Sequence, residues 1–237
     1  MDTMMDEVGT AGLARYDAVV VGGGAAGLSG ALALARARRS VLVIDAGEPR
    51  NAPADKVHNY LGREGTPPLE LLAIGRSEVA GYGGEIVTGR VTAVTRIGNG
   101  EFRVEQSDGT AVIGRRLLVT TGLTDELPDL PDLAQHWGRD VLHCPYCHGW
   151  EVRNKRLGIL AATPMALHQA QLVRQWSDDL TVFGAGIDDL DAATEQRLRA
   201  RGTKIVATWV LEITGEADHL VVRTDDGQAT EVDALFT

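Results

Sequence analysis

Two cysteines, Cys144 and Cys147, stand close together in the segment His143-Cys144-Pro145-Tyr146-Cys147-His148. This C-x-x-C spacing suits a dithiol that can close to a disulfide, and it also suits half of a zinc site. The chain has no other cysteine, and no second C-x-x-C or H-x3-H pair completes a set of four zinc ligands. Pro145 favours the first turn of a helix, whose N–H groups stabilise a thiolate. We therefore predict a redox couple without a metal; a zinc site using the flanking histidines and a pair of inert buried cysteines are the alternatives.

A glycine cluster, Gly22-Gly23-Gly24-Ala25-Ala26-Gly27, satisfies the pattern G-x-G-x-x-G between an apolar segment and a helical one. In such a βαβ unit the first glycine permits a tight turn, the second lets the backbone approach a pyrophosphate, and the third allows close helix packing. The helix start attracts phosphate, and Asp45, at the end of the next apolar segment, can accept a hydrogen bond from a ribose hydroxyl. The cluster predicts a dinucleotide site, with a glycine-rich turn that binds no ligand as the alternative.

Six apolar segments predict the strands that position these residues. Continuous hydrophobicity, in place of alternation, is typical of parallel strands that are buried on both faces. The segments are 16–21, 41–45, 117–121, 157–160, 180–183 and 204–206. Leu28, Ala31, Leu32 and Ala35 follow helical spacing, which predicts a helix over 25–38 between the first two strands.

Alternating segments and turn dipeptides predict antiparallel strands elsewhere. In 89–114 the pairs Asn99-Gly100 and Asp108-Gly109 suit type I′ turns, which predicts a meander. A second βαβ-like run begins at Leu157, and a hairpin over 208–232 turns at Asp226-Gly227 and near Gly215. The proline-bearing segment 123–131 is interpreted as a linker. The pattern as a whole predicts an α/β chain: a Rossmann-like βαβ unit with a meander, then a smaller α/β unit.

Composition excludes several classes of function. The 237 residues include 23 Lys and Arg against 33 Asp and Glu, and the resulting charge of −10 disfavours a nucleic-acid partner. Two cysteines are too few for a secreted disulfide scaffold. The N-terminus is polar and acidic, unlike a signal peptide, and no apolar run reaches the roughly 20 residues of a membrane span. We expect a cytoplasmic protein without a membrane partner, beginning with a flexible tail over 1–14.

The order of these motifs carries a family resemblance. A G-x-G-x-x-G unit, a meander, the turn Thr121-Gly122 and then C-x-x-C resemble the low-molecular-weight thioredoxin reductase family of FAD-dependent pyridine nucleotide-disulfide oxidoreductases. The resemblance runs from about Arg15 to the end of the chain. Segments 47–51 and 58–62 look like the flavin-contacting segments of that family. The run Cys-Pro-Tyr-Cys-His-Gly-Trp-Glu resembles the branch that includes dithiol oxidases of the gliotoxin and holomycin type.

The resemblance implies a role for each site residue and each domain. It implies an FAD-binding domain over 15–122 and an inserted NAD(P)-type domain, carrying the cysteines, over 123–237. The residues implied to hold FAD are Gly22, Gly24, Ala25, Ala26, Gly27, Asp45, Arg50, Asn51, Asn59, Thr121 and Gly122. Cys147 would face the flavin, Cys144 would face the substrate, and His148 would shuttle a proton, with a capping or surface role as the alternative for this histidine. The substrate would be a small dithiol or disulfide, or a thioredoxin-like protein. The protein itself would form a homodimer.

Two departures from the family pattern shape the functional prediction. Ala161 and Thr163 occupy the first two glycine positions of the second nucleotide loop, and 180–196 contains no Lys or Arg. These features argue against NADPH, because a side chain obstructs the pyrophosphate and no cation meets a 2′-phosphate. The sequence ends at Thr237, about where the family's chain returns to the FAD domain, so we expect that return segment to be missing. We predict an FAD-dependent thiol–disulfide oxidoreductase that favours dithiol oxidation. An NADPH-dependent thioredoxin reductase and a truncated, catalytically impaired binding module are the alternatives.

Overall fold

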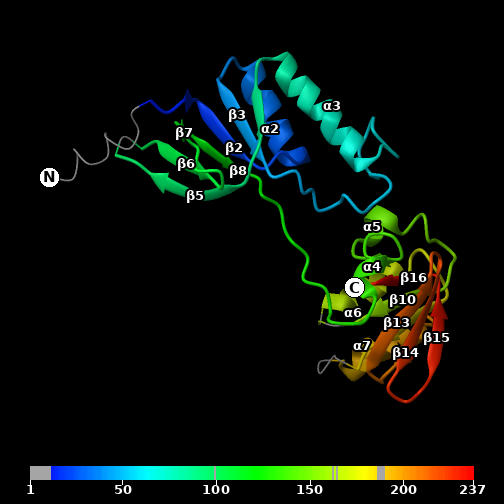
Figure 1. Cartoon of the computed structure of the whole chain (residues 1–237). Helices are drawn as coiled ribbons and strands as arrows, with labels where there is room; N and C mark the ends of the chain where they lie inside the picture. Colours follow the sequence, from blue (N-terminus) through cyan, green and yellow to red (C-terminus); the bar gives the residue numbers. More distant parts are fainter. Residues whose placement is uncertain (1–11, 99, 162, 164, 186–189) are drawn as a thin grey trace. The chain divides into compact units, whose positions relative to one another are not determined.

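The computed structural model describes residues 12–98, 100–161, 163, 165–185 and 190–237. Most of the tail that the sequence predicts over 1–14 therefore lies outside the described residues. The chain folds as two compact units (Figure 1). Unit 1 comprises the described residues up to Ala52 together with Thr66–Thr124, and unit 2 comprises Pro53–Gly65 and Asp125–Thr237. The cofactor roles of the predicted domains 15–122 and 123–237 stay a prediction.

Unit 1 is built on a parallel sheet with the strand order β4-β3-β2-β8. The strands are β2 (Ala18–Val21), β3 (Val41–Asp45), β4 (Glu85–Thr88) and β8 (Leu117–Val119). Helices α2 (Ala25–Arg36) and α3 (Pro68–Gly81) cover one face of this sheet. Leu28 and Ala31 of α2 pack there with Val20 and Val43, so the helical stripe expected from the sequence faces the sheet.

A meander covers the other face of the sheet in unit 1. It consists of β5 (Val91–Arg96), β6 (Phe102–Gln106) and β7 (Ala111–Gly114), and β1 (Arg15–Tyr16) pairs with β7. Val104 packs there against Val19, Leu42 and Ile44. The single strand predicted over 16–21 is wrong in one respect. Asp17 exchanges hydrogen bonds with Ser40, and the chain crosses there from the meander sheet to the parallel sheet.

Unit 2 repeats the parallel sheet, with the strand order β12-β11-β10-β16-β9. The strands are β9 (Val141–Leu142), β10 (Leu157–Leu160), β11 (Leu180–Phe183), β12 (Lys204–Val206) and β16 (Ala234–Phe236). Helices α6 (Met165–Val173) and α7 (Ala192–Ala200) cover one face, where Ala170 and Leu198 pack with Ile159 and Val182. Strand β16, which the sequence pattern did not predict, pairs with both β10 and β9.

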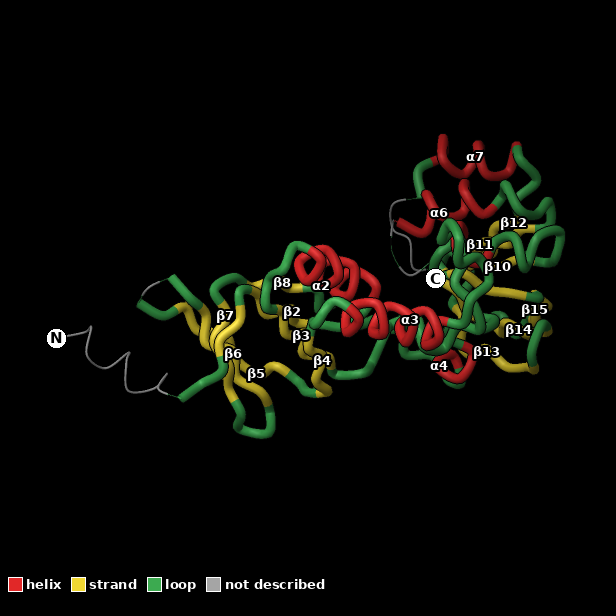
Figure 2. The backbone as a smooth tube through the Cα atoms, turned by 90° about the horizontal axis from the view of Figure 1, so that it is seen from above, coloured by secondary structure: helices red, strands yellow, loops and turns green. Residues whose placement is uncertain are grey.

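A second meander covers the other face of the sheet in unit 2. It consists of β13 (Val210–Glu216), β14 (His219–Thr224) and β15 (Ala229–Val232), and Leu220 and Val222 pack against Leu160 and Phe183. Two short helices complete the unit, α4 (Leu133–His136) and α5 (Pro145–His148). In each unit the two longer helices lie on one side of the parallel sheet and the meander on the other (Figure 2). The predicted α/β class with parallel sheets is confirmed.

The longest helix in the described part of the chain, α3, has 14 residues. A bilayer crossing needs about 20, and no helix among these residues is long and apolar enough to cross a membrane.

Candidate cofactor site and dithiol site

The glycine cluster forms the turn between β2 and α2 in unit 1. Gly22 has a φ of 100°, and a Cβ there would lie 2.4 Å from the carbonyl oxygen of Thr120. A Cβ at Gly27 would lie 1.9 Å from the carbonyl oxygen of Gly22, so the helix approaches the turn more closely than a side chain allows. A Cβ at Gly24 would meet no heavy atom within 4 Å among the described residues. Gly22 and Gly27 are therefore needed by the fold of the turn, whereas Gly24 leaves open space.

The start of α2 is open for an anion. Gly24 is the N-cap residue, and no side chain caps the helix. Ala25 and Ala26, in the first turn, are exposed. Unpaired N–H groups at a helix start bind phosphate, and the space beside Gly24 admits a pyrophosphate. This part of unit 1 fits the pyrophosphate of FAD.

The carboxylate of Asp45 lies at the end of β3 beside the glycine turn. Its Oδ1 accepts a hydrogen bond of 3.0 Å from the N–H of Gly23, and its Oδ2 pairs with the guanidinium of Arg76 on α3. A carboxylate oxygen can accept more than one hydrogen bond, so the predicted contact with a ribose hydroxyl stays open to Asp45. Sequence analysis missed Arg76, because its helix has a weak apolar stripe and no motif marks the residue.

Thr120 is a second residue of this site that the sequence did not single out. Its hydroxyl donates to the carbonyl oxygens of Val21 and Gly22, at 3.0 and 2.9 Å, and so ties the end of β8 to the turn. The predicted residues Thr121 and Gly122 follow it and are exposed, as are Arg50 and Asn51 beyond β3. Asn59 belongs to unit 2, not to the unit that holds the glycine turn.

The cysteine pair lies at a single helical turn in unit 2. Cys144 is the N-cap of α5, and its carbonyl oxygen accepts hydrogen bonds from the N–H groups of Cys147 and His148, at 3.1 and 3.2 Å. The two cysteines are not joined by a disulfide; Cys144 is half-buried and Cys147 is exposed.

Tight packing fixes the turn behind the cysteines. A Cβ at Gly149 would lie 2.4 Å from the carbonyl oxygen of Pro145 and 2.7 Å from the Trp176 ring. The ring of Tyr146 meets that of Trp176 edge to face, with their centres 5.5 Å apart. The indole of Trp176 thus supports both the tyrosine between the cysteines and the glycine after His148. The turn is therefore held by its own packing.

His148 is half-buried at the end of this turn. Its Nδ1 is buried and meets no hydrogen-bond partner among the described residues. Burial lowers the pKa of His148 below its ordinary value; the Glu151 carboxylate opposes this shift, and His58 reinforces it. This shift favours the neutral imidazole, which is the form that can accept a proton. By contrast, His143 is exposed.

A loop of the segment Pro53–Gly65 lies against the cysteine turn. The amide of Asn59 donates a 2.6 Å hydrogen bond to the carbonyl oxygen of Tyr146, between the two cysteines. Beside it, Nδ1 of His58 lies 2.6 Å from Glu64 and Nε2 lies 3.6 Å from Glu151. Sequence analysis placed His58 in a segment that resembles a flavin-contacting one and Glu151 in the run after the cysteines, but it did not predict their contact, because no local spacing shows that residues 58 and 151 meet.

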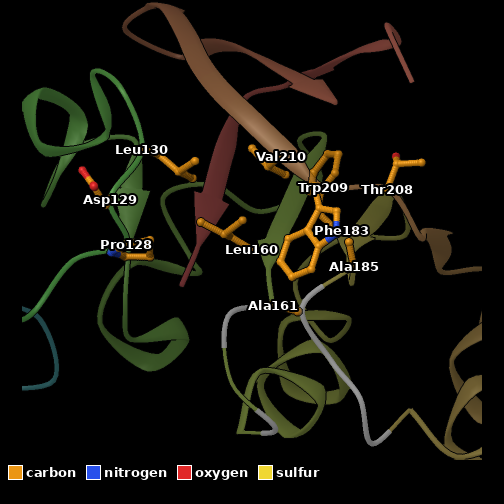
Figure 3. Close-up of a pocket in the computed structure, with 10 residues that line it drawn as sticks. All are labelled: Pro128, Asp129, Leu130, Leu160, Ala161, Phe183, Ala185, Thr208, Trp209 and Val210. Carbon is orange, nitrogen blue, oxygen red and sulfur yellow. The ribbon is translucent and has the colours of Figure 1, made fainter. Parts of the chain in front are cut away.

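The second nucleotide loop, after β10, has a pocket of about 320 Å³ beside it (Figure 3). Its lining comes from the linker before α4, the ends of β10 and β11, and the start of β13. The lining residues are Pro128, Asp129, Leu130, Leu160, Ala161, Phe183, Ala185, Thr208, Trp209 and Val210. They include one anion, Asp129, and no cation. Ala162 and Pro164 of this loop, and residues 186–189 of the range 180–196 that the sequence analysis considered, lie outside the described residues.

The described residues hold no group of three or more His, Cys, Asp or Glu side chains that could bind a metal ion. Unit 1 therefore offers a helix start that can bind phosphate. Unit 2 offers a dithiol with the His148 imidazole and two carboxylates nearby.

Comparison with known proteins finds relatives that cover most of this chain. Residues 16–237 match the family described as pyridine nucleotide-disulphide oxidoreductase. The thioredoxin reductase tcpT of Claviceps purpurea is 33% identical over 235 residues, which cover 92% of this chain and 72% of that protein. The crystal structure of HlmI is similar with a TM-score of 0.90 and 43% identity, covering 95% of this chain and 71% of that one. An oxidoreductase from Agrobacterium tumefaciens is similar with a TM-score of 0.88 and 41% identity, covering 94% of this chain and 74% of that one. The chain therefore belongs to the pyridine nucleotide-disulphide oxidoreductases, in the thioredoxin reductase-like branch of FAD-dependent enzymes that act on sulfur groups.

Proposed function

We propose that the chain oxidises a dithiol through the Cys144/Cys147 pair, with His148 as the proton acceptor. The observation that carries this proposal is the half-buried imidazole of His148, which follows the exposed Cys147 directly and whose buried Nδ1 meets no hydrogen-bond partner among the described residues. A base with a pKa at or below neutrality can take the proton of a thiol and so form the nucleophilic thiolate. FAD, when bound to this family's fold, supplies the two-electron redox chemistry, and dioxygen is the terminal oxidant.

The proposed thiol–disulfide exchange starts from the disulfide form of the Cys144/Cys147 pair and takes two steps. A substrate thiolate attacks Sγ of Cys144, which forms a mixed disulfide and releases Cys147 as a thiolate. The second substrate thiolate then attacks the substrate sulfur of the mixed disulfide and releases Cys144. The substrate loses two electrons and two protons, and the pair gains the electrons. His148 accepts one of the protons as the attacking thiol ionises, and solvent takes the other.

The substrate class that we propose is a small dithiol, with a thioredoxin-like protein as the competing class.

The second candidate function is NADPH-driven reduction of a disulfide. The lining of the pocket beside the second loop disfavours this candidate, because it offers an anion and no cation to a 2′-phosphate. We further propose that Cys147 is the thiol that faces the flavin, as the family resemblance implies, and that the protein acts as a homodimer.

The visible spectrum of the purified protein, loaded with FAD, tests these proposals. Anaerobic dithiothreitol should bleach the flavin absorbance, and air should restore it. Cys147→Ser should abolish bleaching by the dithiol. Tyr146→Phe is the matched control, since it changes an exposed side chain inside the same turn and should bleach normally.

Three results would contradict the proposal. Bleaching by NADPH but not by the dithiol would favour the reductase. Unchanged bleaching in Cys147→Ser would remove the role of that thiol. A protein that folds but takes up no FAD would leave only a binding role.

A further inference from the structure

The pocket beside the second nucleotide loop combines buried and exposed side chains, and all of its lining residues belong to unit 2. Leu160 and Phe183, which end β10 and β11, are buried core residues. By contrast, Trp209 lies just before β13 and is 59% exposed. Figure 3 shows Trp209 and Phe183 on one side of the pocket, with Asp129 and Leu130 on the other. The pocket is therefore an apolar recess with an aromatic edge that solvent reaches.

The backbone of Trp209 is fixed although its side chain is exposed. Its carbonyl oxygen accepts a 2.9 Å hydrogen bond from the N–H of Asp225, and its own N–H donates to the Asp225 carboxylate at 3.2 Å. The next residue, Val210, also lines the pocket and packs against the core. An exposed indole gains little from folding, because most of its apolar surface stays in water. The fold thus holds at the pocket edge a ring whose surface is still available to a ligand.

The charge and the size of the pocket restrict what it can bind. Asp129 is the one ionisable residue among the described residues of the lining, and it is exposed. A carboxylate repels phosphates and other carboxylates and attracts cations. Small-molecule pockets range from about 300 to 1,000 Å³. The volume of about 320 Å³ is therefore suited to a compact ligand and not to a dinucleotide.

We propose that this pocket binds a small aromatic molecule without a negative charge, and that the ring of this molecule contacts the indole of Trp209. Apolar side chains form most of the lining, and an indole favours stacked or edge-to-face contact with another ring. Asp129 accepts a neutral or cationic substituent and disfavours an anionic one. The proposal goes beyond the dithiol chemistry and does not depend on it, because no lining residue belongs to the cysteine turn or to the segment Pro53–Gly65.

Three naphthalenes that share a ring system and differ in charge test the proposal. At neutral pH 1-naphthylmethanol is neutral, 1-naphthylmethylamine is cationic and 1-naphthoate is anionic. Saturation-transfer NMR titrations of the whole chain, with FAD present, measure the dissociation constant of each molecule. The neutral and the cationic molecules should bind. The anionic one should bind about threefold more weakly than the neutral one, because it lies near a solvent-screened carboxylate.

Substitutions assign the binding to this pocket. Trp209→Ala should weaken the binding of 1-naphthylmethanol about fivefold, because it removes the contact between two rings. Asp129→Asn should bring the dissociation constant of 1-naphthoate close to that of 1-naphthylmethanol, because the repelling charge is lost. Trp150→Ala is the matched control, since it removes a tryptophan of similar exposure, 65%, that does not line the pocket. This variant should bind 1-naphthylmethanol as the natural chain does.

Four results would overturn the proposal. The first is that none of the three naphthalenes binds. The second is that Trp209→Ala binds 1-naphthylmethanol as tightly as the natural chain, or that Trp150→Ala weakens its binding equally, since the ligand would then lie elsewhere. The third is that 1-naphthoate binds more tightly than 1-naphthylmethanol. The fourth is that NADP⁺ displaces 1-naphthylmethanol, because the pocket would then belong to a nucleotide site.

Discussion

The turn that follows β2 in unit 1 begins at Gly22, and the turn that follows β10 in unit 2 begins in the same way at Ala161. In unit 1 the N–H of Gly22 donates to the carbonyl oxygen of Ile44 on the next strand, at 2.8 Å. In unit 2 the N–H of Ala161 makes the equivalent bond to Phe183, at 3.0 Å. The methyl group of Ala161 is buried, where Gly22 has no room for a Cβ. The first position of such a turn therefore accepts an alanine where the backbone leaves room for a Cβ, whereas the turn of unit 1 requires glycine at Gly22 and Gly27 and leaves only Gly24 open for a ligand.

The two units also differ in the charged side chains beside the turn. In unit 1 the strand next to the turn ends in Asp45, which is paired with Arg76. In unit 2 the equivalent strand ends in Phe183, followed by Gly184 and Ala185. Unit 1 keeps a carboxylate for a ribose, and unit 2 replaces it with apolar side chains that line a pocket. The difference suggests that one unit binds a nucleotide while the other retains mainly the scaffold.

The largest effect should follow from Gly27→Ala in unit 1. The new Cβ would stand 1.9 Å from a backbone oxygen, so α2 must move away from β2. Overpacking of this kind costs about 3 kcal/mol in the free energy of unfolding. Thermal unfolding followed by circular dichroism should show the loss of stability, and the flavin absorbance after purification should be lost with it.

Gly24→Ala separates the fold of this turn from its ligand. A Cβ at Gly24 meets nothing within 4 Å in the described chain, so stability should stay close to that of the natural sequence. The methyl group would nevertheless occupy the space where the pyrophosphate must approach, so FAD should bind more weakly. Undiminished FAD retention in Gly24→Ala would show that the turn does not hold the pyrophosphate.

Much of the fold of the two units could be predicted from the sequence, because the strands of the parallel sheets are short continuous apolar runs. Strands β3, β10, β11 and β12 have the predicted bounds. Helix α3 was missed because only three of its 14 residues, Pro68, Leu72 and Val79, are buried, which leaves a weak periodicity. Strand β16 was missed because its three residues follow the last strand of the predicted hairpin with only Asp233 between them. Its place in the sheet follows from pairing with strands far away in the sequence.

The site residues also fall into those that a local sequence pattern marks and those that it does not. Glycines, a C-x-x-C pair and an adjacent histidine carry local patterns, so Gly22, Gly27, Cys144 and Cys147 could be singled out. The residues that support them could not. Arg76 reaches Asp45 across 31 positions, and His58 reaches Glu151 across 93. Such contacts depend on packing between distant segments, which no local spacing encodes.

A smaller effect should follow from Asp45→Asn. The amide keeps the shape of the side chain but loses the charge that pairs with Arg76 and strengthens a hydrogen bond to a ribose hydroxyl. A charge-assisted hydrogen bond contributes about 1.5–3 kcal/mol, so FAD should bind at least about tenfold more weakly. Stability should fall by no more than about 1 kcal/mol, because Arg76 is 39% exposed and its ion pair is screened.

Titration of the apoprotein with FAD, followed by flavin fluorescence, measures this change. Asp108→Asn is the matched control, since Asp108 lies in an exposed turn of the meander in the same unit. Unchanged FAD affinity in Asp45→Asn would show that the carboxylate serves Arg76 and the turn alone, and the charge difference between the two units would lose its meaning for binding.

The smallest effect should come from restoring glycines to unit 2. Ala161→Gly with Thr163→Gly should lower stability by about 1 kcal/mol, because the double variant removes a buried methyl group and loosens the chain. It should gain no preference for 2′,5′-ADP over ADP in a calorimetric titration, since no cation lines the pocket. Adding Ala185→Arg should create that preference, because a guanidinium at the end of β11 can pair with the 2′-phosphate. If the double variant alone prefers 2′,5′-ADP, then backbone access and not charge separates the two turns, and the absence of cations in the pocket no longer argues against NADPH.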